Sequence, residues 1–302
     1  MYEKFFSLTS MPFSIAPDPK FLFMSARHRE ALAHLIYGVK NNGLVLLTGE
    51  VGTGKTTICR YLLSDLPDNV ETAFIINPKV TETELLSSIC DDLRIPYPQK
   101  ATSKTLVDLL NTHLLDTLKE DKRTLVIIDE AQNLSVDVLE QLRLLTNLET
   151  NQRKLLQIIL LGQPELLNTL SGNSLRQLSQ RITASYHLNA LNKKETRQYI
   201  AYRLSVAGAK VNIFQRSAMD RIYRISKGIP RVINLICDRC LLGAFAENQP
   251  LISRRIVKAA SNEILPNRPI YSHIAGTILY LSLIHISEPT RRTPISYAVF
   301  CL

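Results

Sequence analysis

The sequence predicts an α/β fold in which a parallel β-sheet is covered by helices on both faces, followed by a small all-helical domain. Two observations support this prediction. Over residues 1–190, short apolar runs of strand length alternate with segments of helical period, as in a parallel sheet with helical crossovers. Beyond Leu188 only helical segments follow. We therefore expect an α/β domain over residues 1–190 and a helical domain over residues 191–266.

Five apolar runs rich in β-branched residues or leucine define the expected strands. The runs are Leu44–Thr48, Thr72–Asn77, Thr124–Asp129, Leu155–Leu161 and Ala184–Leu188. Two helix starts are visible, one before the first run and one between the second and the third. Ser25 precedes a helix expected at His28–Val39, and Thr81 and Glu84 have the spacing of a capping box.

The helical part opens with the same signal, because Asn192 and Glu195 repeat the capping-box spacing. Further helices are expected at Phe214–Lys227, Arg231–Glu247 and Ser253–Glu263. No strand pattern interrupts this region, so we expect it to pack as helices alone.

The composition is that of a folded intracellular protein. The chain has 302 residues, of which 45% are hydrophobic, and five cysteines. This length allows two domains with sizeable cores, and the low cysteine content argues against a disulfide scaffold. The first residues lack the basic segment and unbroken apolar run of a secretory signal, so we expect no export signal.

The net charge of +9 is unevenly distributed along the chain. Residues 1–190 carry 19 basic and 21 acidic side chains, whereas residues 191–268 carry 15 and 5. Any basic surface therefore belongs to the helical part. Such a surface fits anionic lipid as readily as nucleic acid, so the charge by itself does not favour DNA.

The clearest chemical signal is a phosphate-binding loop. Residues 49–56 match the pattern G-x-x-x-x-G-K-[ST] between an expected strand and an expected helix. The glycines let successive N–H groups face a phosphate, Lys55 neutralises β- and γ-phosphate oxygens, and the Thr56 hydroxyl is a ligand for Mg²⁺. The candidate nucleotide-binding residues here are Gly49, Glu50, Val51, Gly52, Thr53, Gly54, Lys55, Thr56 and Thr57.

Two carboxylates, Asp129 and Glu130, stand at the carboxyl end of the third expected strand, the edge where ligands of open α/β sheets bind. We expect Asp129 to hold Mg²⁺ through its water shell and Glu130 to polarise the water that attacks the γ-phosphate. An acidic pair at this place also occurs simply as a helix start. Its position beside the phosphate-binding loop favours hydrolysis of ATP.

Further polar residues are candidates for contacts with the γ-phosphate. Gln163 follows the fourth expected strand, within reach of the phosphate or the attacking water; alternatively, it caps the helix that begins at Pro164. Arg176 and Arg181 precede the fifth strand, and Arg181 is the preferred candidate for an arginine that reaches a neighbouring subunit. The alternative for both arginines is a solvated helix surface.

Arg231 occupies an unusual place, because it lies in the first turn of an expected helix after Gly228 and Pro230. A cation there opposes the helix dipole. We therefore expect Arg231 to face an anion, the phosphates of a nucleotide, with a solvated surface position as the alternative.

In this order, the motifs resemble the ExeA/GspA family of AAA+ ATPases over residues 1 to about 280. The segments that carry the resemblance, besides the phosphate-binding loop, are Pro12-Phe13, Pro17-Asp18-Pro19, Asp129-Glu130-Ala131-Gln132, Leu161-Gly162-Gln163-Pro164-Glu165-Leu166, Gln180-Arg181-Ile182 and Gly228-Ile229-Pro230-Arg231. The resemblance implies a P-loop NTPase sheet with a helical lid. It also implies Walker A at Lys55 and Thr56, Walker B at Asp129 and Glu130, sensor 1 at Gln163, the box VII arginine at Arg181 and sensor 2 at Arg231.

The resemblance further implies a cellular role. Members of the family are cytoplasmic ATPases with one membrane-spanning helix and a periplasmic peptidoglycan-binding region. They work with the inner-membrane protein ExeB/GspB to assemble the secretin of the general (type II) secretion pathway. By resemblance, this chain is an oligomeric ATPase that uses ATP and Mg²⁺ and is anchored to the inner membrane.

Other functions share much of this motif set. The pilus-biogenesis ATPase MshM and the transposition ATPases MuB and TniB also resemble the chain, so the pathway stays open. A transposition ATPase would bind DNA in an ATP-dependent, salt-sensitive manner. A nucleotide-switched scaffold would bind ATP with negligible turnover.

The end of the chain departs from the family. Residues 269–287 contain no Asp, Glu, Lys or Arg, which is borderline length for a membrane helix, and we expect such a helix to start over residues 267–280. From Leu281 the sequence resembles a translation of the transposase adapter of sequencing libraries. We therefore expect residues 281–302 to be non-native and the periplasmic region to be missing from this sequence.

Overall fold

The computed structural model describes residues 1–264 except 17, 41–42, 77–78 and 151–153. The expected membrane segment at 267–280 and the adapter-like tail at 281–302 lie outside the described residues, as do Pro17 and Asn77. Residues Met1–Ser261 form one structural unit. Within the described ranges, no helix is both long enough and apolar enough to cross a bilayer.

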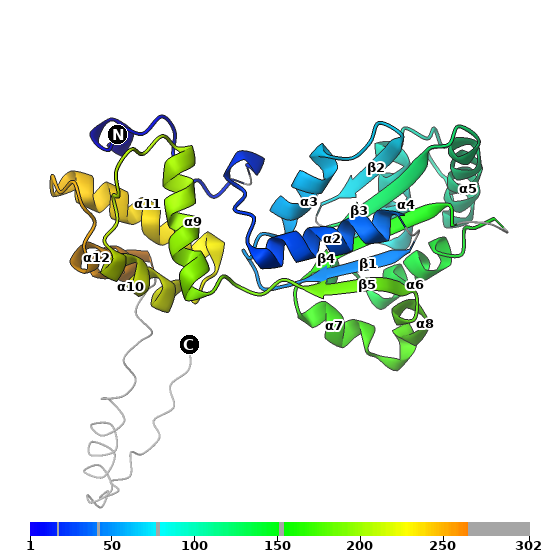
Figure 1. The fold of residues 1–302 in the computed structure, drawn as a ribbon. Coiled ribbons are helices and arrows are strands. Elements are labelled where there is room, and N and C mark those ends of the chain that lie inside the picture. Colours follow the sequence, from blue (N-terminus) through cyan, green and yellow to red (C-terminus); the bar gives the residue numbers. More distant parts are fainter. Residues whose placement is uncertain (17, 41–42, 77–78, 151–153, 265–302) are drawn as a thin grey trace, which may run out of the picture. The chain divides into compact units, whose positions relative to one another are not determined.

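Five parallel strands form a sheet in the order β2-β3-β4-β1-β5, which confirms the predicted α/β fold (Figure 1). The strands are β1 (Leu44–Thr48), β2 (Val70–Ile75), β3 (Arg123–Ile128), β4 (Leu156–Gly162) and β5 (Ile182–His187). β1 has the predicted bounds, whereas the other strands begin one or two residues away from them. The ends depend on pairing, as at β2, which begins with Val70 opposite Arg123.

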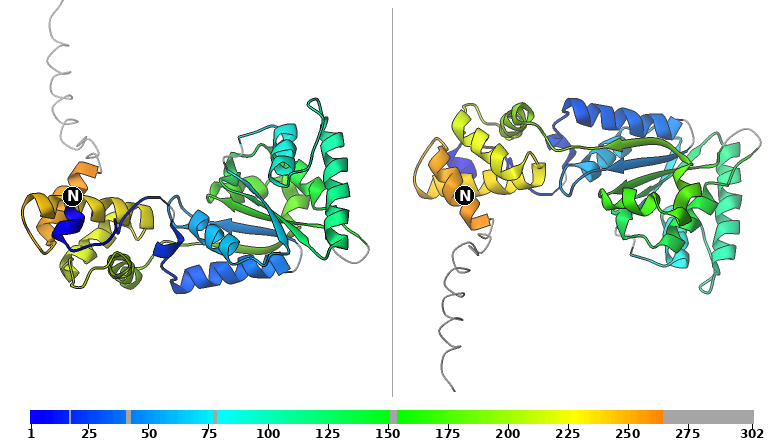
Figure 2. Two further views of the ribbon diagram at one scale, coloured as in Figure 1. Left: turned by 90° about the horizontal axis from the view of Figure 1, so that it is seen from above. Right: turned by 90° about the horizontal axis from the view of Figure 1, so that it is seen from below.

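Helices cover both faces of the sheet and create two cores (Figures 1 and 2). On one face lie α2 (Ala26–Lys40) and α3 (Lys55–Ser64). The other face carries α4 (Glu82–Asp92), α5 (Ser103–Lys119), α6 (Val136–Leu145), α7 (Glu165–Leu170) and α8 (Arg176–Ser179). Side chains of β1 alternate between the cores, because Val45 and Leu47 belong to the first and Leu44 and Leu46 to the second.

The chain after β5 is helical, as predicted, with α9 (Lys193–Val206), α10 (Arg216–Ser226), α11 (Pro230–Ala246) and α12 (Arg254–Ile264). Both predicted capping boxes are present, at the starts of α4 and α9. α10 begins two residues later than expected, because Phe214 forms a bridge with Ile252 and Gln215 is the N-cap. Two short elements precede β1: α1 (Tyr2–Phe5) and the 3₁₀ turn η1 (Pro19–Phe21).

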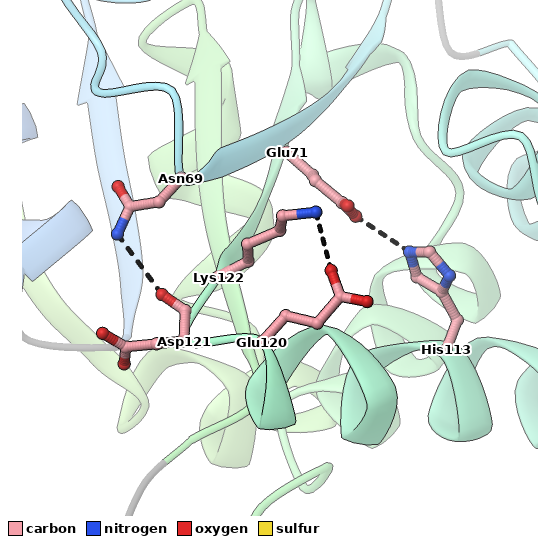
Figure 3. A network of polar contacts seen from close by, with 6 residues as sticks. All are labelled: Asn69, Glu71, His113, Glu120, Asp121 and Lys122. Atoms are coloured by element: carbon pink, nitrogen blue, oxygen red, sulfur yellow. Dashed lines mark hydrogen bonds and ion pairs between the residues drawn. The ribbon is translucent and has the colours of Figure 1, made fainter.

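A polar network ties α5 to the amino ends of β2 and β3, the sheet edge opposite the candidate site (Figure 3). Nε2 of His113 lies 2.9 Å from Oε2 of Glu71, and Asn69 Nδ2 donates to the Asp121 carbonyl at 3.3 Å. Lys122 and Glu120 form an ion pair in the same network. Glu71 thus has a side-chain partner on α5, and its backbone belongs to β2 because it pairs with Thr124 of β3.

The segment between α10 and α11 requires glycine at position 228. Gly228 has φ +81°, and a Cβ atom there would lie 1.8 Å from the Leu191 carbonyl oxygen. We expect Gly228→Ala to lower the free energy of unfolding by about 2 kcal/mol or more, because the substitution adds both backbone strain and a clash with main chain. Denaturant unfolding of both proteins measures this difference.

Gly243 within α11 is the matched control. A Cβ atom there meets nothing closer than 3.9 Å. Gly243→Ala is expected to be neutral or to stabilise by about 0.5–1 kcal/mol, since alanine favours a helix over glycine. Equal unfolding midpoints for Gly228→Ala and the unmodified protein would contradict the assigned constraint.

Candidate functional site

The phosphate-binding loop connects β1 to α3, and α3 begins at Lys55 as the motif requires. The Lys55 side chain is 6% exposed, and its Nζ donates to the carbonyl oxygens of Gly49 at 2.7 Å and Glu50 at 3.1 Å. Burial lowers the pKa of Lys55, while the nearby carboxylates of Glu130 and Asp129 act in the opposite direction. A cation is thus held inside the loop, facing two acidic residues.

A hydroxyl and a carboxylate meet beside the loop. Thr56 Oγ1 donates to Asp129 Oδ2 at 2.7 Å, which joins the first turn of α3 to the carboxyl end of β3. Asp129 is buried, and its Oδ1 accepts from the Glu130 N–H at 2.9 Å. Mg²⁺ prefers oxygen ligands and is bound in nucleotide sites by one or two carboxylates together with phosphates. The Thr56 and Asp129 oxygens fit this donor set.

Glu130 is held by two side-chain amides. Its Oε2 accepts from Gln132 Nε2 at 2.6 Å and from Gln163 Nε2 at 3.2 Å, and Gln132 Oε1 accepts from the Gln163 N–H at 3.0 Å. The Glu130 backbone has φ +53°, a left-handed conformation that is costly for a residue with a side chain. The two hydrogen bonds from the amides fix the direction of this carboxylate.

The electrostatics keep Glu130 ionised. Partial burial opposes its charge, but the hydrogen bonds from Gln132 and Gln163 and the Lys55 charge outweigh burial and hold the pKa of Glu130 below its usual range. A carboxylate that is aimed and ionised is suited to act as a base. Gln132 had no expected role, although its position two residues after Glu130 was a usable signal.

The three candidate arginines differ in their surroundings. Arg231 lies in the first turn of α11, and its N–H donates to the Gly52 carbonyl at 3.2 Å. Gly52 must be glycine, since a Cβ atom there would lie 2.5 Å from the Arg231 Cβ. Arg181 donates to the carbonyl and hydroxyl oxygens of Thr146, both at 3.2 Å. Arg176 is exposed. The structure thus brings Arg231 to the loop and Arg181 to the end of α6.

A cavity of about 310 Å³ adjoins the loop. Residues 51–57, Glu130 and Arg231 line one part of it. The remaining lining residues lie before β1 and on α9 and α11, and apart from Asp18 and Pro230 none of them belongs to a motif described above: Ser14, Ile15, Ala16, Asp18, Phe21, Leu22, Phe23, His28, Tyr199, Arg203, Pro230 and Asn234. The volume is at the lower end of the range for small-molecule sites.

His28 closes the cavity beside the loop. Its Nδ1 lies 2.7 Å from the Ser25 hydroxyl, and burial lowers its pKa, opposed by a hydrogen bond to the Thr53 carbonyl. Its Nε2 would lie 3.3 Å from a Cβ atom on Gly54. The ring is therefore a neutral, fixed part of the wall behind the loop.

A family model described as "AAA domain" matches residues 39–170. The chain carries an AAA domain. The matched residues include the phosphate-binding loop, Asp129, Glu130 and Gln163, and they end at the last residue of α7.

The chain also has a curated relative, General secretion pathway protein A of Aeromonas hydrophila. It is 53% identical over 265 residues, which cover 87% of this chain and 48% of that protein. This identity confirms the predicted relationship to that protein. The chain spans about half the length of the curated relative that it matches.

Solved structures share the fold of this chain. Cdc6p of Pyrobaculum aerophilum has a TM-score of 0.65 at 20% identity and matches over 87% of this chain and 71% of its own. The ORC2 protein of Aeropyrum pernix has a TM-score of 0.60 at 19% identity, over 83% and 68% of the two chains. RuvB of Thermotoga maritima has a TM-score of 0.53 at 18% identity, over 86% and 77%. These likenesses confirm the P-loop NTPase fold.

Proposed function

We propose that this chain binds ATP with Mg²⁺ and hydrolyses ATP to ADP and phosphate. The observation that supports the proposal most strongly is the meeting of a cationic loop, an oxygen donor pair and an aimed carboxylate at the carboxyl ends of β1, β3 and β4. These groups come from three separate parts of the sequence. Ligands of open parallel sheets bind at this edge.

The loop supplies the phosphate-binding groups. Its N–H groups and the amino end of α3 favour an anion, and the Lys55 ammonium exchanges its bonds to the Gly49 and Glu50 carbonyls for phosphate oxygens. Thr56 and Asp129 hold Mg²⁺, which supplies charge stabilisation for the phosphates when bound. Thr57 and the remaining loop residues complete the contacts with the nucleotide.

Glu130 acts on the attacking water. Its ionised carboxylate accepts a proton as the water oxygen attacks the γ-phosphorus and ADP leaves. Gln163 and Gln132 orient the carboxylate through the hydrogen bonds described above. Gln163 also lies on the loop after β4, where its amide is placed to respond to the γ-phosphate. Arg231 offers its charge from the first turn of α11.

We propose that the ATPase works as a homo-oligomer in which an arginine before β5 reaches the site of a neighbouring subunit. Arg181 serves this role if its bonds to Thr146 open on assembly, whereas Arg176 is already exposed. The division into an α/β domain over residues 1–190 and a helical lid over residues 191–266 is part of the same proposal, since the lid carries Arg231.

For the pathway, the 53% identity to General secretion pathway protein A supports a secretion role over pilus biogenesis or transposition. We propose that the chain is the cytoplasmic ATPase of a membrane-anchored secretion component that promotes secretin assembly. Its expected partners are an ExeB/GspB-like inner-membrane protein and peptidoglycan. The basic charge of the helical part is then explained by a nearby anionic membrane rather than by DNA.

Removal of Mg²⁺ tests the proposed chemistry. We expect the full chain to release phosphate from ATP with Mg²⁺ present and to fall to background with excess EDTA, because Thr56 and Asp129 then hold no ion beside the phosphates. Phosphate release and the binding of a fluorescent ATP analogue are measured on the same protein. Release at an equal rate in EDTA, or no binding of ATP at all, would overturn the proposal.

A further inference from the structure

A buried arginine in α9, Arg203, holds the N-terminal strap, which we define as residues 12–16, by hydrogen bonds to its main chain. Arg203 is 6% exposed. Its Nε donates to the Pro12 carbonyl, and a terminal nitrogen donates to the Ser14 carbonyl at 3.3 Å. These two bonds join segments about 190 residues apart in the sequence. A guanidinium with fixed, planar donors is well suited to hold two carbonyls in a defined arrangement.

Two further side chains, Tyr199 and Asn234, extend this hydrogen-bond network back to the strap. Arg203 donates to the Tyr199 hydroxyl at 3.0 Å, that hydroxyl donates to Asn234 Oδ1 at 2.8 Å, and Asn234 Nδ2 donates to the Ser14 carbonyl at 3.4 Å. These hydrogen bonds thus form a closed network that runs from α9 through α11 and back to the strap. Ser14 accepts from two side chains of the helical part, so its carbonyl is tightly placed.

The charge of Arg203 is stabilised without an ion pair. No carboxylate in the described part of the chain forms a salt bridge with it, while its guanidinium lies 4.6 Å from the centre of the Phe21 ring and 5.7 Å from that of Tyr199. Burial of an arginine is costly unless hydrogen bonds and aromatic faces replace water. All of the groups that replace water around the guanidinium belong to residues of the strap or of the cavity wall.

The residues around Arg203 form the part of the cavity that has no role in the proposed phosphate chemistry. Ser14, Phe21, Tyr199 and Asn234 line the same cavity as the phosphate-binding loop. η1, which carries Phe21, contacts both α3 and α9. The aromatic rings of Phe21 and Tyr199 and the amide of Asn234 suit a planar heterocycle and a ribose rather than a phosphate.

We propose that Arg203 is a positioning residue that holds the strap as the wall of the nucleoside half of the pocket and thereby sets the affinity for the base and ribose. The proposal rests on the proposed binding of ATP at this site. Arg203 also lines the cavity, but its three nitrogens donate to Pro12, Tyr199 and Ser14, so it acts through the strap, and the phosphates are bound by the loop independently of it. Loss of the hydrogen bonds from Arg203 to the strap should therefore weaken the nucleoside contacts selectively.

Two ligands separate the halves of the pocket: ATP and inorganic tripolyphosphate, which lacks a nucleoside. We expect Arg203→Lys to raise the Kd of ATP about tenfold, because lysine cannot hold both carbonyls, and to leave the Kd of tripolyphosphate within about twofold. KM for ATP should rise similarly, with kcat within about threefold. Calorimetric titration of the full chain with each ligand gives both constants.

Matched variants keep the test decisive. Arg197 lies on the same helix and pairs with Asp220 away from the cavity, so Arg197→Lys should change neither constant. Tyr199→Phe removes only the hydroxyl that links Arg203 to Asn234 and should shift the ATP constant in the same direction by about threefold. This isosteric change keeps the test valid if Arg203→Lys fails to fold.

Two results would overturn the proposal. Equal weakening of ATP and tripolyphosphate would mean that Arg203 supports the whole site, and a lower melting temperature with unchanged constants would mean that it only stabilises the fold. If the unmodified chain binds neither ligand, the proposed ATPase function fails instead, and the two failures are thereby distinguished.

Discussion

Glu130→Gln is expected to stop hydrolysis while leaving ATP bound. The amide oxygen of glutamine can still accept the hydrogen bonds from Gln132 and Gln163, so the geometry of the site is retained. The amide cannot take a proton from water, and the loss of a positioned base lowers rates by about 10²–10⁴-fold. Phosphate release measures the loss, and a fluorescent ATP analogue measures the retained affinity.

The control for this experiment is Glu120→Gln. Glu120 is an exposed glutamate that pairs with Lys122 at the opposite edge of the sheet. Its substitution makes the same change in charge far from the loop, and it should leave the rate unchanged. Equal rates of phosphate release for Glu130→Gln and the unmodified protein would show that another group activates the water.

Lys55→Ala is expected to weaken ATP binding strongly. The Lys55 ammonium is the buried cation of the loop, and charge-assisted hydrogen bonds to phosphate oxygens are among the strongest in proteins. Loss of two such bonds corresponds to a rise in Kd of about 10²-fold or more. Titration with ATP measures this change, and phosphate release should fall to background as a consequence.

Lys119→Ala supplies the matched control, since Lys119 is an exposed lysine at the end of α5. It should bind ATP as the unmodified protein does. The melting temperatures of both variants show whether the fold is kept, because Lys55 also satisfies the Gly49 and Glu50 carbonyls. An ATP affinity within threefold of the unmodified value in Lys55→Ala would refute the assignment of the loop.

Much of the fold was predictable because its signals are local. The capping boxes at Thr81 and Asn192 were confirmed, since both members of each pair lie within one turn of helix. β1 also had the predicted bounds, because every one of its residues is buried and apolar or semipolar. The start of β2 was wrong by two residues. Its first residue pairs with Arg123, and no local pattern encodes that partner.

The candidate site was predictable to the same extent. The motif located Lys55 and Thr56, and the strand pattern predicted that Asp129 lies nearby. The 2.7 Å hydrogen bond between Thr56 and Asp129 agrees with this prediction. Gln132 received no role, although it contributes the shortest hydrogen bond to Glu130. The surroundings of Arg181 were also beyond prediction, because Thr146, the C-cap residue of α6, lies before β4 in the sequence whereas Arg181 lies after it.

By itself, the sequence determined the succession of strands and helices along the chain, the phosphate-binding loop and the two carboxylates after β3. Each of these depends on residues close together in the chain, where period and spacing carry the information. Only the tertiary structure decided which amides hold Glu130 and which side chains form the nucleoside half of the cavity. Arg203 meets Pro12 and Ser14 across about 190 residues, and contacts at that separation arise from packing and have no spacing that a sequence pattern could reveal.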